Sequence, residues 1–311
     1  MLRYLDRLDD DIHRRIVNKK RELESMGKLT DEHLDKIAKA VEIEYVYNTN
    51  SMEGNTLTIG ETGRVLNGMT ISGKPLTDIQ EIKNNPTAIN IIKDLAFNRK
   101  APFRQQEIIA LHGISMYKVM EDAGKYRQDD RTKVQDAKFT PTHWYEIESE
   151  MDELMQFINE NPDGLSPIEL AAHAHYWFTY IHPFGDGNGR IARLLTNFIL
   201  LRNHYPFIVF KKVDRKQYIR TLQKASDDGY FEPFLIYTAG VLEQSLDTYL
   251  HALKGDTKKE KLLPLTVLAK NTPYTPDYLR VLANRRMIDA TKQGKTWLTT
   301  KKIINSYVKQ H

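Results

Sequence analysis

Apolar residues recur at helical spacing through most of this chain. Behind Thr30, a residue type that caps helices, apolar side chains three or four positions apart predict a helix that runs to about residue 46. Residues 60–86 are less regular and predict a loop or a short helix. The helical spacing predicts five further helices, over Thr142–Asn159, Pro167–Ile181, Asn188–Asn203, Arg215–Ser226 and Phe231–Leu253.

Strand patterns are scarce. Arg127–Phe139 has few apolar residues at helical spacing, and Val134 and Phe139 fit a short hairpin. Beyond residue 258 the order reads helix, turn, helix, a hairpin around Gly294 and a last helix. A length of 311 residues suits two domains, or one large domain with a small appendage.

Charge is spread unevenly along the chain. The net charge is +4, but residues 258–311 hold twelve Lys or Arg and three Asp or Glu, which is +9. A basic segment on a mildly acidic body indicates a separate module, and the polar stretch 254–257 marks its boundary. We therefore expect an N-terminal helical region over 1–100, a core over 101–256 and a small C-terminal module over 257–311.

The composition excludes several kinds of site. The chain has no cysteine, so disulfides, a cysteine nucleophile and cysteine-ligated zinc are ruled out. The N-terminus has scattered charges and lacks the apolar stretch of a signal peptide. The longest run without Asp, Glu, Lys or Arg is 170–185, which is short for a membrane-spanning helix. We expect a soluble, cytoplasmic protein that does not bind membranes.

The most informative stretch, from His182 to Arg193, lies between two predicted helices. Its alternating glycines let consecutive backbone N–H groups turn inward as an anion nest, and the next helix adds its positive end. Arg190 and Arg193 reach the same mouth and suit bidentate phosphate contact. Asp186 suits Mg²⁺ held against phosphates. His182 suits removal of a proton from a hydroxyl near neutral pH.

This set of groups describes nucleotidyl or phosphoryl transfer. A glycine-rich turn between helices is the alternative, and it would be preferred for a lone G-x-G-x-G. The histidine, aspartate, asparagine and two arginines at these offsets favour the functional interpretation.

The stretch matches the Fic family motif H-x-F-x-[D/E]-G-N-G-R-x-x-R at each specified position. The resemblance covers roughly residues 40–250. It implies an all-α fold with a β-hairpin flap, and transfer of AMP from ATP to a Ser, Thr or Tyr hydroxyl of a target protein. The motif's roles then fall on His182 as base, Phe184 as loop anchor, Asp186 for Mg²⁺, Gly187, Asn188 and Gly189 for the α-phosphate, and Arg190 and Arg193 for the β- and γ-phosphates.

Residues 49–54, Thr-Asn-Ser-Met-Glu-Gly, resemble the inhibitory motif [S/T]-x-x-x-E-[G/N] of this family. Thr49 and Glu53 are four apart and share a face of a helix. In such family members the glutamate pairs with the second arginine, here Arg193, and its carboxylate keeps ATP from binding productively. The alternative is a helix end with a solvated glutamate. In some members the same glutamate supports the removal of AMP.

Two further segments resemble parts of the family site. Gly124–Arg127 resembles the start of the flap, and Lys133 to Asp136 would then lie on the strand that receives the target peptide. From that strand we include Val134 and Gln135 among the nucleotide-site residues. Tyr218 and Ile219 resemble the aromatic pair that borders adenine, with Ile219 replacing the second aromatic residue. The alternatives are an ordinary surface hairpin and a core tyrosine.

Residues 258–311 resemble the winged-helix module that is often fused C-terminally in Fic proteins. Their basic charge suits contact with DNA phosphates. Arg280, Arg285 and Arg286 are the candidates on the expected recognition helix. A small helical cap with solvated charges is the alternative.

Together these observations predict an Mg²⁺-dependent protein adenylyltransferase that uses ATP and is inhibited by Glu53. The alternatives are a nucleotide-sensing, DNA-binding regulator and an enzyme that removes AMP with the help of Glu53. The expected partners are a target protein, DNA through residues 258–311 and a second copy of the chain in a homodimer.

Overall fold

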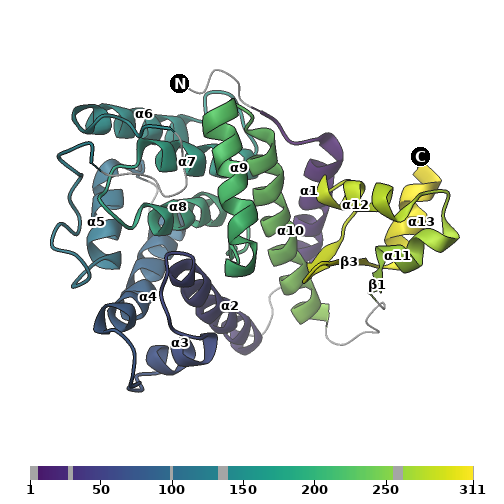
Figure 1. Ribbon diagram of the computed structural model, residues 1–311, viewed down its shortest axis with the longest axis horizontal. Coiled ribbons are helices and arrows are strands. Elements are labelled where there is room, and N and C mark those ends of the chain that lie inside the picture. The colour runs from purple at the N-terminus through teal and green to yellow at the C-terminus, as the bar shows by residue number, and fades with distance from the viewer. Residues whose placement is uncertain (1–5, 27–30, 99–100, 132–138, 255–261, 311) are drawn as a thin grey trace. The chain divides into compact units, whose positions relative to one another are not determined.

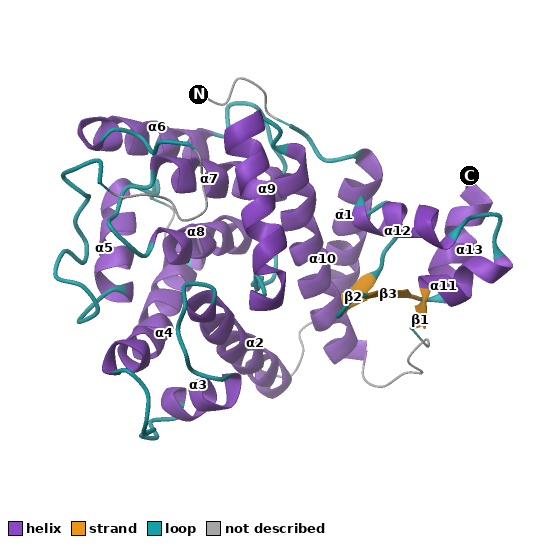
Figure 2. Cartoon of the chain, viewed as in Figure 1, coloured by secondary structure: helices purple, strands orange, loops and turns teal. Residues whose placement is uncertain are grey.

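The computed structural model describes residues 6–26, 31–98, 101–131, 139–254 and 262–310. The chain divides into two compact units (Figure 1). Unit 1 consists of Met1–Arg7 and Lys28–Val241, and unit 2 of Leu8–Gly27 and Leu242–His311. Helices dominate both units, and every strand of the described residues belongs to unit 2 (Figure 2).

Unit 1 is built around one central helix, α8 (Asn188–Arg202), whose residues are buried along nearly its whole length. It packs most extensively against α7 (Pro167–Ile181) and α4 (Leu76–Phe97). The remaining elements are α2 (Asp31–Ser51), α3 (Ile59–Leu66), α5 (Gln105–Ser115), η1 (Trp144–Glu146), α6 (Ile147–Glu160), η2 (Lys212–Asp214), α9 (Arg215–Asp228) and α10 (Glu232–Lys254), which continues into unit 2.

The all-α prediction is confirmed, and each of the six predicted helices is present. The prediction for residues 60–86 is confirmed only in part, because α3 is a short helix there but the 22-residue helix α4 begins at Leu76. The buried face of α4 includes the polar residues Asn84 and Asn85, and Pro86 lies inside the helix, so this helix shows no continuous apolar stripe in its sequence. Its buried Asn84 donates to the carbonyl oxygens of Ser115 and Tyr117, at 3.1 and 2.9 Å. Helices α1 and α5 were not predicted.

The expected flap falls mainly on residues 132–138, which lie outside the described residues. Val134 and Gln135 are therefore outside them as well. The flanking residues 127–131 and 139 contain no strand. The hairpin and its two nucleotide-site residues stay predictions.

Unit 2 contains a small antiparallel sheet in the order β1-β3-β2. Gly294, with φ +58°, makes the turn between β2 and β3, where the sequence predicts a hairpin. Leu279, Ile288 and Ile304 belong to the apolar core of the unit. Its elements are α1 (Asp10–Ser25), β1 (Leu263–Pro264), α11 (Leu265–Leu268), η3 (Ala269–Asn271), α12 (Pro276–Asn284), β2 (Thr291–Gln293), β3 (Thr296–Thr299) and α13 (Lys301–Gln310).

The three candidate DNA-binding arginines differ in environment. Arg286 is buried and lies over the ring of Trp297, 5.9 Å from its centroid. Arg280 is exposed but pairs with Asp277 of the same helix. Arg285 is exposed. Arg286 thus has a packing role, and DNA binding by a winged-helix module stays a prediction.

The two units do not follow the three segments expected from the sequence, because α1 joins the C-terminal residues. Arg15 donates to both carboxylate oxygens of Glu243 on α10, at 3.0 and 3.2 Å. Lys19 donates to Asp247 at 2.8 Å and to Asp289 at 2.7 Å. These partly buried charge pairs connect residues more than 200 positions apart along the chain, a connection that local pattern does not reveal.

Among the described residues, no helix is long and apolar enough to cross a membrane.

Candidate active site

The loop between α7 and α8 begins at a strained residue. His182 ends α7 with φ 51°, in the left-handed region that side chains other than glycine rarely adopt. Its amide still donates to Phe178 O, at 3.0 Å. Arg127 holds the same turn, because its Nε donates to His182 O at 2.9 Å and its amide to Pro183 O at 3.0 Å. Such strain persists only where surrounding contacts fix it, and it gathers at functional sites.

The middle of the loop is closed by two buried side chains. Asn188 accepts a hydrogen bond from Phe184 N at 3.0 Å and donates one to Phe184 O at 2.8 Å. The Phe184 ring is fully buried and stacks on His112 with a centroid distance of 3.7 Å. The loop is thereby preorganised before any ligand arrives, and the side chain of Asn188 serves the loop itself.

The imidazole of His182 is neutral at physiological pH. Burial lowers the pKa of His182 to about 4, against the opposing effect of a backbone hydrogen bond to Thr179. Nδ1 lies 3.3 Å from Thr179 O. Because a carbonyl only accepts, we assign the proton to Nδ1, which leaves a lone pair on Nε2. His182 is therefore ready to accept a proton.

Arg193 is buried and held by the end of α2. Its Nε donates to Thr49 Oγ1 and its Nη2 to Thr49 O, both at 2.9 Å. Nη2 also donates to Glu53 Oε1 at 2.7 Å. Nη1 is buried and has no hydrogen-bond partner among the described residues, which leaves a donor for a ligand. The predicted pairing of Glu53 with Arg193 is thus present.

The carboxylate of Glu53 lies at the beginning of α8. A Cβ atom placed on Gly189 would lie only 2.4 Å from Glu53 Oε1, so glycine is required for this approach. The backbone N–H groups at the start of a helix carry partial positive charge and attract anions. Glu53 therefore fills a site whose chemistry suits a phosphate group.

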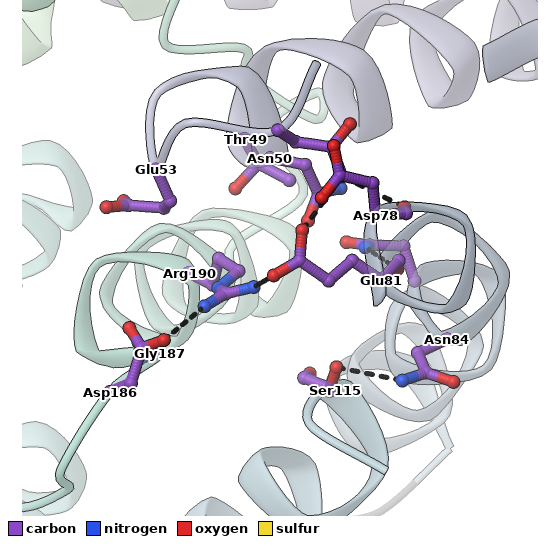
Figure 3. A network of polar contacts seen from close by, with 12 residues as sticks. Thr49, Asn50, Glu53, Asp78, Glu81, Asn84, Ser115, Asp186, Gly187 and Arg190 are labelled. Atoms are coloured by element: carbon purple, nitrogen blue, oxygen red, sulfur yellow. Dashed lines mark hydrogen bonds and ion pairs between the residues drawn. The ribbon is translucent and has the colours of Figure 1, made fainter. Parts of the chain in front are cut away.

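Arg190 has two carboxylate partners (Figure 3). Nη1 donates to Glu81 Oε1 at 2.5 Å, and Nη2 donates to Asp186 Oδ2 at 3.3 Å. The other oxygen of Glu81 accepts from Asn55 Nδ2 at 2.8 Å, two residues beyond Glu53. Both loop arginines are thus connected to the same short segment, 53–55. Sequence reasoning missed Glu81, because no motif marked it.

The end of α2 is also held from the side of α9. Arg215 Nε donates to Met52 O at 2.7 Å, and the amide of Lys212 donates to Asn48 Oδ1 at 2.8 Å. Together with the contacts of Arg193, these bonds fix the segment that carries Glu53. Its carboxylate is held in place from two separate parts of unit 1.

The residues expected near adenine lie partly in the core. Tyr218 is 3% exposed, and its hydroxyl lies 2.8 Å from His175 Nε2. Burial raises the pKa of Tyr218 to about 12, with Arg193 acting in the opposite direction. Ile219 is half-buried. The structure brings Tyr218 close to Arg193, and a role for Tyr218 and Ile219 in binding a base stays a prediction.

Asp186 is the only acidic residue between His182 and Arg193, and its side chain is 67% exposed. No group of three His, Cys, Asp or Glu that could enclose a metal ion occurs in the described part of the chain. Mg²⁺ is commonly held by one or two carboxylates together with substrate phosphates. A single exposed carboxylate beside an anion site fits that mode of binding.

Comparisons with known proteins agree with this site. A model of the Fic/DOC family matches residues 102–200. A Fic domain-containing signalling protein from Bacteroides thetaiotaomicron, known from a crystal structure, is 31% identical in sequence to this chain. The structural match covers 79% of this chain and the whole of the other, with a TM-score of 0.74. The helices and the loop from His182 to Arg193 thus define a Fic-type protein. This chain belongs to the Fic/DOC family.

Other relatives extend the comparison. Protein adenylyltransferase Fic of Nematostella vectensis is 30% identical over 76% of this chain and 60% of its own length. Protein adenylyltransferase fic-1 of Caenorhabditis briggsae is 34% identical over 68% of this chain and 41% of its own length. The chain therefore spans about half the length of these curated relatives. A Fic family protein from Desulfovibrio desulfuricans, 20% identical with a TM-score of 0.67, shares the fold over 95% of this chain and 97% of its own.

Proposed function

We propose that this chain is a protein adenylyltransferase, which transfers AMP from ATP to a Ser, Thr or Tyr hydroxyl of a target protein and is inhibited by Glu53. The proposal rests on the position of the Glu53 carboxylate, which lies against Gly189 and accepts a hydrogen bond from Arg193. An anion of this chain already occupies the start of α8 beside an unused guanidinium N–H. The names of the relatives from Nematostella and Caenorhabditis give the transferred group.

The reaction follows from the positions of these groups. Nε2 of His182 accepts the proton of the target hydroxyl while the hydroxyl oxygen attacks the α-phosphorus of ATP. The bond to the bridging oxygen breaks, pyrophosphate leaves, and AMP stays on the target oxygen. The backbone N–H groups of Gly187, Asn188 and Gly189 stabilise the α-phosphate, and Arg190 and Arg193 bind the β- and γ-phosphates.

Mg²⁺ would be held by Asp186 and would neutralise phosphate charge as a Lewis acid. In this proposal ATP is the donor substrate and the target protein the acceptor. A homodimer and a cytoplasmic location stay predictions from the sequence.

The position of the radioactive label in ATP tests the proposal. Incubation of the Glu53→Gly variant with Mg²⁺, a lysate and ATP labelled on the α-phosphate should label protein, whereas ATP labelled on the γ-phosphate should not. Label from the γ-phosphate would instead indicate phosphoryl transfer. Loss of AMP from a modified protein in the presence of the wild type, but not of Glu53→Gly, would instead favour the enzyme that removes AMP with the help of Glu53.

The pH dependence should reflect the buried state of His182. The base must be neutral to accept a proton, and its pKa lies near 4. Transfer by Glu53→Gly should therefore fall by less than about 10% between pH 7.5 and pH 6.0, measured as initial rates at saturating ATP. A histidine with the ordinary pKa of about 6.5 would lose about three quarters of its activity over this range. A fall of that size would contradict the assignment.

A further inference from the structure

His112 on α5 belongs to none of the sequence motifs, yet it contacts the catalytic loop between α7 and α8 twice and Gly124 once. It is fully buried. Its Nε2 lies 3.0 Å from Asp186 O, and its Nδ1 lies 2.8 Å from the amide nitrogen of Gly124. Its ring stacks on Phe184 with an interplanar angle of 1°. Both nitrogens and one face of the ring are used.

These contacts fix the tautomer of His112. The amide of Gly124 can only donate, so Nδ1 accepts and Nε2 carries the proton that is donated to Asp186 O. Burial lowers the pKa of His112 to about 4, against the opposing effect of the hydrogen bond to the backbone of Asp186. The ring therefore keeps one neutral form at physiological pH.

A close approach of two glycines allows this arrangement. Gly124 has φ +79°, and a Cβ atom there would lie 3.2 Å from the Cα atom of Gly113 and 3.3 Å from Ile109 O. Only glycine lets the backbone at 124 come this near to α5, which brings its amide to the ring of His112. The Gly124–Arg127 segment and the catalytic loop are joined through one imidazole.

The hydrogen bond from His112 determines the direction of one loop peptide. A trans peptide is planar, so when the carbonyl of Asp186 faces His112, the N–H of Gly187 faces the opposite side. On that side it donates to Asp186 Oδ1, at 2.5 Å. Gly187 has φ +79°, and glycine tolerates several backbone conformations. The loop's own conformational preferences therefore do not exclude a reversed peptide, which would point a carbonyl oxygen at the anion site.

We propose that His112 is a positioning residue that holds the Asp186–Gly187 peptide with its N–H toward the α-phosphate. The inference rests on the proposed function, because it assigns this N–H to the α-phosphate of the AMP that is transferred. His112 itself touches no substrate. It acts through the loop, by keeping a carbonyl oxygen away from the anion and a donor directed at it.

Substitution of His112 in the Glu53→Gly background tests the inference. His112→Phe keeps a ring on Phe184 but removes both hydrogen bonds, and it should lower kcat about 100-fold, the typical effect of losing one donor to a developing oxyanion. His112→Gln restores an N–H donor near Nε2 and should recover about tenfold of that loss. The KM for ATP should change less than kcat.

His173 offers a matched control. It is also fully buried, with Nε2 3.0 Å from the carbonyl oxygen of Asp6, and its ring stacks on Phe231 at 4.1 Å. Burial lowers its pKa as well. His173→Phe should therefore reduce thermal stability as much as His112→Phe does, while kcat stays within about twofold of its parent.

The outcomes separate this inference from the proposed function. If Glu53→Gly transfers AMP and His112→Phe leaves kcat within threefold, the inference is wrong. Equal losses of kcat in both histidine variants, or no recovery with His112→Gln, would also overturn it. If Glu53→Gly binds ATP in calorimetry but transfers no AMP, only the proposed function fails. In that case a tenfold weaker affinity for ATP in His112→Phe would still support the inference, and an unchanged affinity would overturn it. If ATP does not bind, both fail.

Discussion

Glu53→Gly should raise the rate of AMP transfer by about 10- to 100-fold at ATP concentrations below saturation. In the wild type, the 2.7 Å pair with Arg193 must break before a γ-phosphate can use the guanidinium. A hydrogen bond between charged groups contributes about 1.5–3 kcal/mol, and every 1.4 kcal/mol is about tenfold in binding. Initial rates over a series of ATP concentrations measure the effect, which should appear mainly as tighter ATP binding.

Two further variants make this prediction specific. Glu53→Gln keeps the shape and an oxygen acceptor but loses the charge, so its rate should lie between those of wild type and Glu53→Gly. Glu121→Gly places the same change at an exposed turn of unit 1 and should leave the rate unchanged. Equal labelling by wild type and Glu53→Gly would keep the transferase but exclude Glu53 as its inhibitor.

The parts of the site that sequence predicts are local ones. His182, Asp186, Arg190 and Arg193 lie within twelve residues, so one loop and the first turns of the helix that follows it bring them together. The link from Glu53 to Arg193 spans 140 positions, and it followed from a resemblance to a known inhibitory motif. Without that resemblance the helix end at Glu53 would have looked like an ordinary solvated turn.

The supporting residues could not be predicted in this way. Glu81 and His112 come from α4 and α5, and they reach the loop because these helices pack around α8. The pattern of α4 is obscured by Pro86 and by buried asparagines that bond to neighbouring backbone. Packing partners of this kind depend on tertiary structure, since nothing in the local period of a helix identifies what covers each face.

His182 is the general base in the proposed reaction. His182→Ala in the Glu53→Gly background should lower kcat by about 10²- to 10⁴-fold, which is the usual contribution of a positioned general base. ATP affinity should stay within about twofold, because the phosphate contacts come from the loop backbone and the arginines. Single-turnover rates and calorimetric titration with ATP measure the two quantities on the same protein.

This separation of kcat from binding distinguishes a base from a structural residue. A proton acceptor acts only in the transition state, so its removal lowers kcat and kcat/KM equally. If the change instead collapsed the strained turn at His182, the amides and arginines beyond it would shift and ATP affinity would fall as well. His251→Ala, at an exposed position on α10, controls for loss of a histidine elsewhere. A kcat within fivefold of the parent would exclude His182 as the base.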